Sequence, residues 1–326
     1  MDETPEARPL FLIDASIYIF QSHFSAYVQC TSRQDQDLSA LYGFIQFLLQ
    51  FLRRAQPAFA AIAHDESLFR GFRHALCSNY KSNRELPDDN LSMQLEAYHL
   101  LGEIFGLASY RSRVYEADDI IGTIATQIRK ARSANSLNEP RQIQIVSRDK
   151  DLAQLLLTER DCLWDFSANK RRFRLHIEEE FGVSAEQLPD FLGLAGDAAD
   201  CISGVPGIGA VKAGQLLREF GTLAEIYRNL DAVAQMKVRG SEQLATVLKE
   251  NRDTAELSRK LATIVCEVGD RDECFGKVSL SDLSVLTPDL DELRSFLVEY
   301  SFGSRESNEI VKQAAQLIKD SSAQAV

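Results

Sequence analysis

Three short apolar runs in the first half of the chain each end at, or lead directly into, an aspartate. They are 9–14 (PLFLID), 58–65 (AFAAIAHD) and 142–147 (QIQIVS), and the last continues into SRDKD. Runs of this length and composition are typical of buried strands, and stretches with helical apolar spacing lie between them. This alternation predicts an α/β fold, with a mostly parallel central sheet and flanking crossover helices.

The second half of the chain has a different pattern. Beyond about residue 175 the strand signal fades and helical patterns dominate, with glycine and proline concentrated in 193–214. The stretch 285–302 is again apolar and amphipathic, so we expect it to return and pack on the first part. A helical region therefore follows the sheet.

Composition excludes some classes of protein. The longest apolar run, 44–52, has nine residues, whereas a membrane-spanning helix needs roughly 20. Six scattered cysteines without a C-x-x-C pair indicate reduced thiols in the cytoplasm, and the polar N-terminus does not resemble a secretory signal. The net charge of −12, if spread uniformly, would repel nucleic acid and anionic membranes.

The acidic side chains are not spread uniformly. Asp14 and Asp65 end two of the predicted strands, and Asp149 and Asp151 follow the third, so all should meet at the carboxyl edge of the sheet, where ligands bind in such folds. Two further groups lie at the start of the isoleucine-faced helix (YEADD) and in GDAAD. The candidate metal ligands are Asp14, Asp65, Glu116, Asp118, Asp119, Asp149, Asp151, Asp197 and Asp200.

Each acid alone has an ordinary structural explanation as a turn residue, a helix cap or a partner of the helix dipole. Nine carboxylates in one crevice would repel one another unless cations neutralise them. Oxygen ligands without cysteine or histidine favour Mg²⁺ or Mn²⁺ over zinc. Two such ions could activate water and stabilise the leaving oxygen in phosphoryl transfer.

A basic segment lies between Glu66 and Glu85. It carries Arg70, Arg73, Lys81 and Arg84, interleaved with the aromatic residues Phe69, Phe72 and Tyr80. Cations and rings in alternation are typical of a nucleic-acid contact, although a solvated basic helix would have the same pattern. A second basic cluster, 170–174, is expected to be a solvated hairpin tip or a further DNA contact.

The segment 204–213 (GVPGIGAVKA) follows GDAAD closely. Its glycines, Gly207 and Gly209 among them, permit a tight turn whose backbone N–H groups could hold a phosphate at a helix N-terminus, with Lys212 one turn further on. An ordinary inter-helix turn is the alternative. Its position beside the acids favours a grip on a duplex backbone.

Taken in order, these segments resemble the flap-endonuclease-like 5′-nuclease family, in particular the 5′-nuclease domain of bacterial DNA polymerase I and its stand-alone relatives. The resemblance covers roughly residues 9–305 and rests on FLID, HDESLFRGFRHALCSNYKSNR, YEADDIIGTIA, SRDKDLAQLL and GDAADCISGVPGIGAVKA. The family usually has glycine where this chain has Arg148, and Ser-Asp-Asn where it has Ala199, Asp200 and Cys201.

The resemblance implies a PIN-like, metal-dependent nuclease domain over 1–175, with an arch or gateway segment near 66–92. It further implies a helical region over 176–326, with a helix-hairpin DNA grip and C-terminal helices that pack back on the first domain. The resemblance also implies roles for single residues. A first metal ion would be held or supported by Asp14, Asp65, Glu116, Asp118 and Asp149, and a second would be held by Asp151, Asp197 and Asp200. Asp118 is a candidate for sharing between the two ions, and Asp119 is either a ligand or a supporting residue. The implied catalytic residues are Lys81 and Arg84, and the implied DNA-binding residues are Arg70, Arg73, Tyr80, Gly207, Gly209 and Lys212.

The implied activity is that of a 5′ to 3′ exodeoxyribonuclease and 5′-flap endonuclease, acting on 5′ ends, flaps, nicks or gaps in DNA repair or replication and leaving a 5′-phosphate. Its implied cofactors are two or more Mg²⁺ or Mn²⁺ ions, with K⁺ as a candidate in the hairpin. We expect a monomer without a membrane partner, associated by analogy with the bacterial nucleoid, with any coupling to a polymerase in trans. The alternatives are a nuclease-inactive protein that binds branched DNA and a PIN-like ribonuclease.

Overall fold

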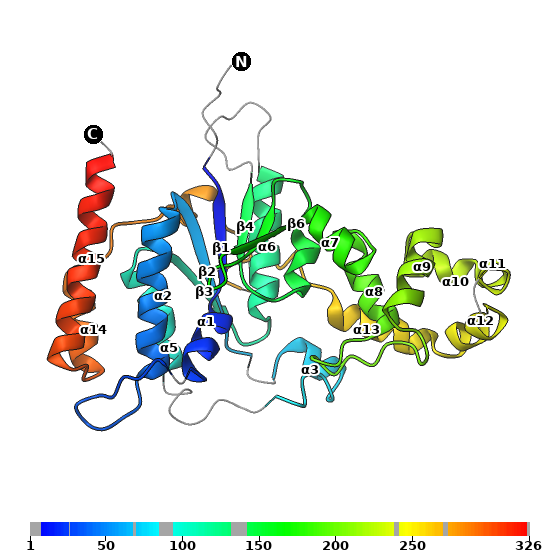
Figure 1. Ribbon diagram of the computed structural model, residues 1–326, viewed down its shortest axis with the longest axis horizontal. Helices are drawn as coiled ribbons and strands as arrows, with labels where there is room; N and C mark the ends of the chain where they lie inside the picture. The colour runs from blue at the N-terminus through cyan, green and yellow to red at the C-terminus, as the bar shows by residue number, and fades with distance from the viewer. Residues whose placement is uncertain are drawn as a thin grey trace, which may run out of the picture.

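A six-stranded sheet forms the centre of the computed structural model (Figure 1). The residues it describes are 8–25, 27–67, 70–84, 94–131, 142–237, 241–269 and 273–324. The strand order is β3-β2-β1-β4-β5-β6, with β1 to β5 parallel and β6 antiparallel to β5. The strands are β1 (Leu10–Asp14), β2 (Phe59–Asp65), β3 (Ala108–Ser112), β4 (Ile143–Val146), β5 (Cys162–Asp165) and β6 (Lys170–Phe173). This topology confirms the predicted fold class.

The central strand, β1, is buried along its whole length. It pairs with β2 on one side and β4 on the other, so that Leu10 lies opposite both Phe59 and Ile143. Strands covered on both faces consist of near-continuous apolar residues, as β1 does. Because the neighbours of β1 are parallel to it, the acids that end β1 and β2 and follow β4 lie along one edge of the sheet.

One face of the sheet is covered by helices from both ends of the chain. They are α1 (Ala15–His23), α2 (Ser39–Ala55), α5 (Leu95–Ile104), α14 (Leu290–Glu299) and α15 (Ser304–Gln324). Phe44 of α2, Trp164 of β5 and Phe296 of α14 belong to the same buried cluster. In Figure 1, α15 stands beside α2, and the two helices contact each other. The apolar stretch 285–302 thus returns to the sheet.

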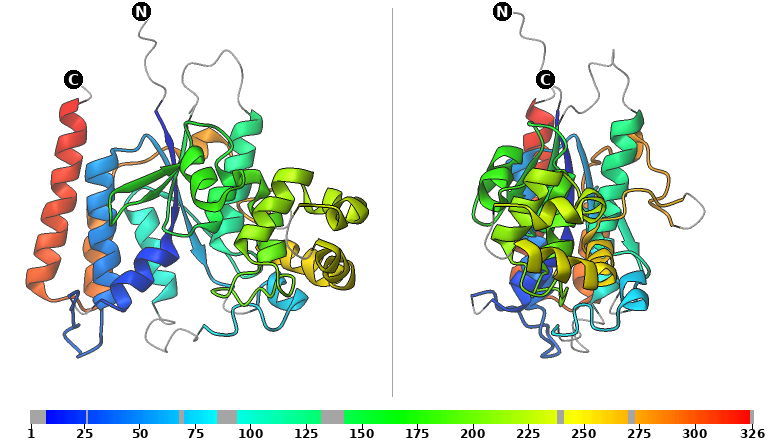
Figure 2. Two further views of the ribbon diagram at one scale, coloured as in Figure 1. Left: turned by 45° about the vertical axis from the view of Figure 1, so that its right-hand side comes forward. Right: turned by 90° about the vertical axis from the view of Figure 1, so that its right-hand side faces the viewer.

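The opposite face carries α6 (Ala117–Ala131), whose isoleucines pack on the sheet. The same buried cluster continues without a break into the helical region, from Leu12 to Leu216 and Leu248. This region projects to one side of the sheet (Figure 2). Its helices are α7 (Arg174–Phe181), α8 (Leu188–Ala195), α9 (Ala210–Phe220), α10 (Leu223–Arg228), α11 (Leu230–Ala234), α12 (Ser241–Glu250) and α13 (Arg252–Ala262).

Four short elements complete the description: α3 (Phe72–Leu76), η1 (Asp151–Leu155), η2 (Ala185–Gln187) and η3 (Leu280–Leu283). The basic cluster expected at a hairpin tip forms β6 and the start of α7. Residues 68–69 and 85–93 of the expected arch lie outside the described residues. None of the helices in the described ranges has the length and apolar character needed to cross a bilayer.

The returning segment before α14 makes a close backbone approach at Gly106. Gly106 has a φ of +76°, its carbonyl accepts a hydrogen bond from the Leu286 N–H at 2.9 Å, and an added Cβ would lie 2.1 Å from the Leu286 carbonyl oxygen. We predict that Gly106→Ala lowers the free energy of unfolding by about 1–2 kcal/mol for the left-handed backbone and by about 1–3 kcal/mol more for the clash. Urea denaturation measures the sum of the two losses.

Gly182→Ala is the matched control. Gly182 has a φ of +69°, and a Cβ there would meet only Arg218 Nη1, at 3.8 Å. This variant should lose the backbone contribution alone. Equal losses in the two variants would contradict the close approach at Gly106.

Candidate active site

The acids that end or follow the strands are held in place by hydrogen bonds, most of them from a residue two positions along the chain. Asp14 accepts a hydrogen bond from the Ser16 N–H at 3.1 Å, as the cap of α1, and another from Ser147 Oγ at 2.9 Å. Asp65 accepts from both the N–H and the hydroxyl of Ser67, at 3.0 and 2.7 Å. Asp149 accepts from the Asp151 N–H at 2.9 Å. These bonds fix the carboxylates at the edge of the sheet.

The other acids reach the same edge from two elements. Glu116, Asp118 and Asp119 lie at the N-terminus of α6, where the helix dipole favours negative charge. Asp197 and Asp200 lie in the loop after α8, and Asp197 pairs with Ile202 across that loop in both backbone directions. The structure therefore gathers the carboxylates that the sequence places on separate segments.

Ion pairs divide the nine acids into two sets. Four of them contact basic side chains: Glu116 with Lys81 at 2.8 Å and Arg73 at 3.2 Å, Asp119 with Arg73 at 2.6 Å, Asp197 with Lys150 at 2.8 Å, and Asp200 with Arg84 at 2.5 Å. Within the described part of the chain, no ion pair reaches the other five, which are Asp14, Asp65, Asp118, Asp149 and Asp151. Five carboxylates thus lie near one another without a direct ion pair in the described residues.

Protonation equilibria reflect this shortage of cations. Burial, together with the charges of Asp149 and Asp65, raises the pKa of Asp14 to about 7. Burial and the charges of Asp149 and Asp197 raise the pKa of Asp151 to about 8. The pKa of Asp118 is raised well above its usual value by burial and the charges of Asp149 and Asp14. Perturbations of this size are typical of functional sites.

Glu116 shows the opposite behaviour. Burial acts to raise its pKa, but the charges and hydrogen bonds of Lys81 and the charge of Arg73 outweigh burial, so that its pKa is lowered. The Tyr80 hydroxyl also donates to Glu116, at 3.0 Å. Glu116 is therefore a fixed anion that holds Lys81 beside the five unpaired carboxylates.

The basic segment packs against the loop that carries Asp200. The Lys81 N–H donates to the Asp200 carbonyl at 3.0 Å, and the Asn83 side chain donates to the Ala199 carbonyl at 3.2 Å. Lys81 adopts a φ of +52°, which is uncommon for a residue other than glycine and is found where the surroundings impose it. Lys81 is buried, whereas the Arg84 side chain is 48% exposed. Arg84 thus remains open to a ligand.

The DNA-binding role expected of Arg73 and Tyr80 is not compatible with their burial. We expected them to bind DNA, but they are only 3% exposed. All five N–H donors of Arg73 are used: toward Asp119 at 2.6 and 2.8 Å, Glu116 at 3.2 Å, and the carbonyls of Leu261 and Thr263, both at 2.9 Å. No donor is left for a phosphate. Arg73 instead joins α3, α6 and the end of α13.

Asp119 also has a supporting position. It is 0% exposed, and its oxygens accept from Arg73, from the Glu116 N–H at 3.0 Å and from the Val265 N–H at 2.8 Å. Of the two roles expected for Asp119, the structure favours support over metal ligation. Its hydrogen bonds fix the N-terminus of α6 and so position Glu116.

The remaining DNA-binding candidates are exposed. Arg70 lies on the surface, and Gly207 and Gly209 have no atom within 4 Å of an added Cβ. Lys212 donates to the Gly207 carbonyl at 3.0 Å, and Gly209 caps α9. The glycine turn therefore presents open backbone at the start of a helix, beside the loop of Asp197 and Asp200.

Two of the residues that differ from the usual family pattern, Arg148 and Cys201, have an identifiable structural environment. Arg148 forms an ion pair with Asp165 at 3.4 Å, and its carbonyl accepts from Arg172 at 3.4 Å. Cys201 has a φ of +56°, a conformation in which asparagine is more favourable than cysteine. The structure gives no reason for alanine at position 199.

The unpaired carboxylates fit divalent cations. In the described ranges no three acidic, histidine or cysteine side chains are already arranged as a coordination sphere. However, the donor set is entirely oxygen, and burial together with neighbouring carboxylates raises the pKa values of Asp14, Asp118 and Asp151, which a bound cation would counteract. The assignment of these acids as metal ligands stays a prediction, and the shortage of positive charge around them supports it.

The sheet with its acidic edge, continued by a helical region, has the architecture of a PIN-like nuclease domain with a C-terminal extension. Residues 9–182 match the family "5′-3′ exonuclease, N-terminal resolvase-like domain", and residues 183–286 match "5′-3′ exonuclease, C-terminal SAM fold". The chain belongs to the 5′-3′ exonuclease family.

Named relatives support this assignment. A 5′-3′ exonuclease of Buchnera aphidicola (Schizaphis graminum) is 30% identical over 261 residues, which are 80% of this chain and 88% of the relative. The DNA polymerase I of Caldicellulosiruptor bescii is 31% identical over 300 residues, 90% of this chain. The chain spans only about a third (33%) of that polymerase.

Solved structures share the fold. The T5 5′-exonuclease with bound zinc has a TM-score of 0.60 and 17% identity, covering 95% of this chain and 99% of that one. A T5 flap endonuclease in a complex with DNA and metal ions has a TM-score of 0.58 and 16% identity, covering 96% and 100%. The catalytic core of Rad2 with DNA substrate has a TM-score of 0.57 and 17% identity, covering 94% and 92%.

Sequence reasoning missed three supporting residues. Lys150 neutralises Asp197, Ser147 holds Asp14, and Ser67 holds Asp65. A signal was available, because each lies within two residues of an acid already singled out. Short hydroxyl side chains beside a strand-ending aspartate are common turn and cap formers.

The buried position of Arg73 leads to a stability prediction. Arg73→Met leaves Asp119 and Glu116 buried without this cation, and breaking such a pair from one side costs about 3–5 kcal/mol in the free energy of unfolding. Urea denaturation of this variant should show that loss. Arg70→Met, on the surface three residues earlier, should change stability by less than about 0.5 kcal/mol. A stable Arg73→Met variant with weakened DNA binding would restore the DNA-guiding role.

Proposed function

We propose that this chain is a structure-specific 5′-nuclease that hydrolyses DNA phosphodiesters at 5′ ends, flaps, nicks or gaps. The observation that carries the proposal is the set of five unpaired carboxylates at the edge of the sheet, with Lys81 and Arg84 beside them. A DNA-binding protein without nuclease activity would gain nothing from this unbalanced negative charge, which repels the phosphates it binds.

Divalent cations would complete the site. Asp14, Asp65, Asp118 and Asp149, with Glu116 in support, are the candidates for a first ion, and Asp151, Asp197 and Asp200 for a second. When bound, Mg²⁺ or Mn²⁺ would supply an activated water and stabilisation of the leaving oxygen, so that the product carries a 5′-phosphate. Two of the solved structures that share the fold contain bound metal ions, zinc in one of them, which is in keeping with a divalent requirement.

The basic residues have separate tasks in this proposal. Lys81, buried and held by Glu116, would donate to the scissile phosphate without moving far, since its position is preorganised. Arg84 is half exposed and would exchange Asp200 for a phosphate oxygen when DNA enters. Both cations would thereby stabilise charge that develops on the phosphate.

The glycine turn would hold the duplex. Its open backbone at Gly207 and Gly209 permits close approach of a phosphate at the N-terminus of α9, with Lys212 near the same anion. We also infer that main-chain carbonyls of this turn could bind K⁺. Such contacts are independent of base identity, which is why recognition would follow DNA structure rather than sequence.

The wider setting is likewise proposed. The matched region makes up about a third (33%) of the DNA polymerase I relative, whose name links the family to DNA synthesis. We propose that the chain acts as a monomer in the cytoplasm, on DNA at the nucleoid.

Asp149→Ala tests the carboxylate site. It should reduce cleavage of a 5′-flap duplex in Mg²⁺ to background while leaving the dissociation constant for the flap duplex within about threefold, because the hairpin contacts remain. EDTA should abolish cleavage by the unaltered chain. Asp291→Ala, which removes an exposed acid of α14, is the control and should cleave normally. Undiminished cleavage by Asp149→Ala would remove the metal assignment.

Single-stranded RNA of the same sequence serves as the competing substrate. The proposed nuclease should prefer the flap DNA, whereas faster cleavage of the RNA would favour the ribonuclease alternative. A chain that binds flap DNA but cleaves neither substrate would be the inactive binding protein.

The raised pKa values predict a pH-dependent response to Mg²⁺. Below about pH 7, Asp14 and Asp151 retain protons in the folded chain, and a cation can bind only after displacing them. The rise in Tm caused by Mg²⁺ should therefore be small at pH 6 and should grow at pH 8. Thermal melts with and without Mg²⁺ at the two pH values measure this difference. An equal rise at both would exclude these carboxylates as ligands.

A further inference from the structure

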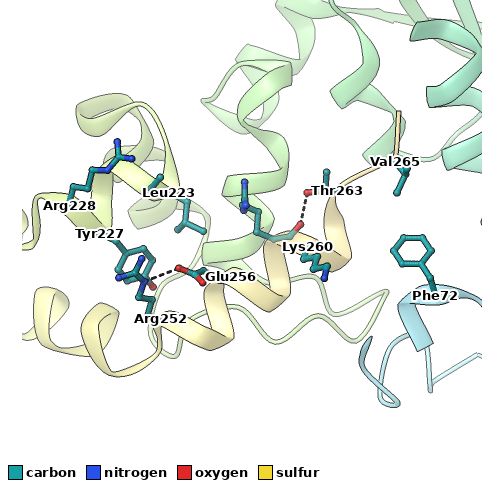
Figure 3. A pocket seen from close by; sticks show the side chains of 11 residues that line it. Phe72, Leu223, Tyr227, Arg228, Arg252, Glu256, Lys260, Thr263 and Val265 are labelled. Atoms are coloured by element: carbon teal, nitrogen blue, oxygen red, sulfur yellow. Dashed lines mark hydrogen bonds and ion pairs between the residues drawn. The ribbon is translucent and has the colours of Figure 1, made fainter. Parts of the chain in front are cut away.

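A pocket lies between the helical region and α3, apart from the acidic edge of the sheet. This pocket, of about 620 Å³, is lined by α10, by α13 and by Phe72 and Val265. Its volume is within the range of ligand sites. Figure 3 shows Tyr227, Arg252 and Glu256 together at one end and Phe72 with Val265 at the other, with α13 between them. The pocket is therefore elongated along α13.

The pocket is basic although the chain is acidic. Four cationic side chains line it, against one acid, Glu256. The four are Arg228, Arg252, Arg259 and Lys260. Arg228 forms an ion pair with Glu225, Arg252 contacts Glu256 at 2.8 Å, and Arg259 lies 3.8 Å from Asp190. Lys260 has no ion pair within the described residues. In a protein of net charge −12, this local excess of positive charge favours an anionic ligand.

Tyr227 provides an independent sign of a ligand. Its side chain lines the pocket, the residue is only 9% exposed, and its hydroxyl is buried without a hydrogen-bond partner among the described residues. A buried hydroxyl without a partner costs free energy in the unliganded protein. A ligand oxygen at this end of the pocket would satisfy the hydroxyl.

The dimensions favour a strand over a single small molecule. Arg252 and Thr263 are eleven residues apart, and the helical rise between them corresponds to roughly 16 Å. Cations along this length and apolar groups at the far end suit consecutive phosphates and bases. One wall also borders the catalytic network, because the Thr263 carbonyl accepts from Arg73, the neighbour of Phe72.

We propose that this pocket binds a single-stranded segment of DNA, with its phosphates on Arg252 and Lys260, a phosphate oxygen on the Tyr227 hydroxyl, and a base against Phe72 and Val265. The proposal rests on the nuclease function, since it gives the unpaired 5′ end of the substrate a place beside the base of the arch segment. It adds a contact surface apart from both the glycine turn and the carboxylates.

The test measures binding without cleavage. The full chain, in the Asp149→Ala background and in EDTA, is titrated against a fluorescent single-stranded octanucleotide that carries a 5′-phosphate. Arg252→Ala/Lys260→Ala should weaken binding about tenfold or more and reduce the salt slope by about 0.7 for each cation removed. Arg294→Ala/Lys312→Ala, two exposed cations on α14 and α15, is the matched control and should bind as the parent does.

Tyr227→Phe gives a second, more conservative variant. Because it removes only an oxygen without a partner, it should leave Tm unchanged or slightly higher while weakening octanucleotide binding severalfold. A Tm loss without any effect on binding would mean that the hydroxyl is structural, and would overturn its role in the site.

Three further outcomes would overturn the proposal: equal affinity of the pocket and control double variants, an equal loss for duplex DNA of the same length, or binding of deoxyadenosine monophosphate as tight as that of the octanucleotide. Failure of the nuclease function would appear elsewhere, as absent flap cleavage by the unaltered chain, since no cleavage enters these binding measurements.

Discussion

Repulsion among carboxylates at one edge of a parallel sheet is the constraint around which this molecule is arranged. The sheet topology brings together acids that are up to 186 residues apart, from Asp14 to Asp200, and burial makes their mutual repulsion costly. Four of the nine are neutralised by basic side chains that come from the arch segment and from the turn after β4. The other five leave a deficit of positive charge, and that deficit gives the site its capacity to attract divalent cations. The fold thus creates the charge imbalance on which the proposed chemistry depends.

The fold could be predicted from the sequence where burial leaves a strong pattern. β1, β2 and β4 are apolar runs because both faces are covered, and the acids were found because each directly follows such a run or begins a helix. β3 was missed because its sequence, ASYRS, belongs to a half-exposed edge strand with no apolar alternation. The aromatic core around Trp164 depends on packing between distant segments, which local patterns do not contain.

Arg73 shows where pattern reasoning fails at the site itself. A run of basic and aromatic residues has the same appearance whether its side chains face solvent or the interior. The deciding information is the position of Asp119 and of the carbonyls at the end of α13, which lie far away in sequence. A buried guanidinium with every donor used contributes by joining elements, and here it connects α3 to α6 and to the end of α13. The same contact places the base of the arch segment against the helical region, where the basic pocket lies.

The packing of the basic segment on the Asp200 loop also fixes the distance between the glycine turn and the carboxylates. The bond between the Lys81 N–H and the Asp200 carbonyl, and the paired backbone of Asp197 and Ile202, hold the start of the glycine turn at a set offset from the carboxylates. Only six residues separate Asp200 from Gly207. A duplex bound at the glycine turn would therefore place at the acids the phosphate that lies a fixed number of nucleotides from the bound part of its backbone. The place of the cut would be decided by distance along the backbone, and the identity of the bases would be irrelevant.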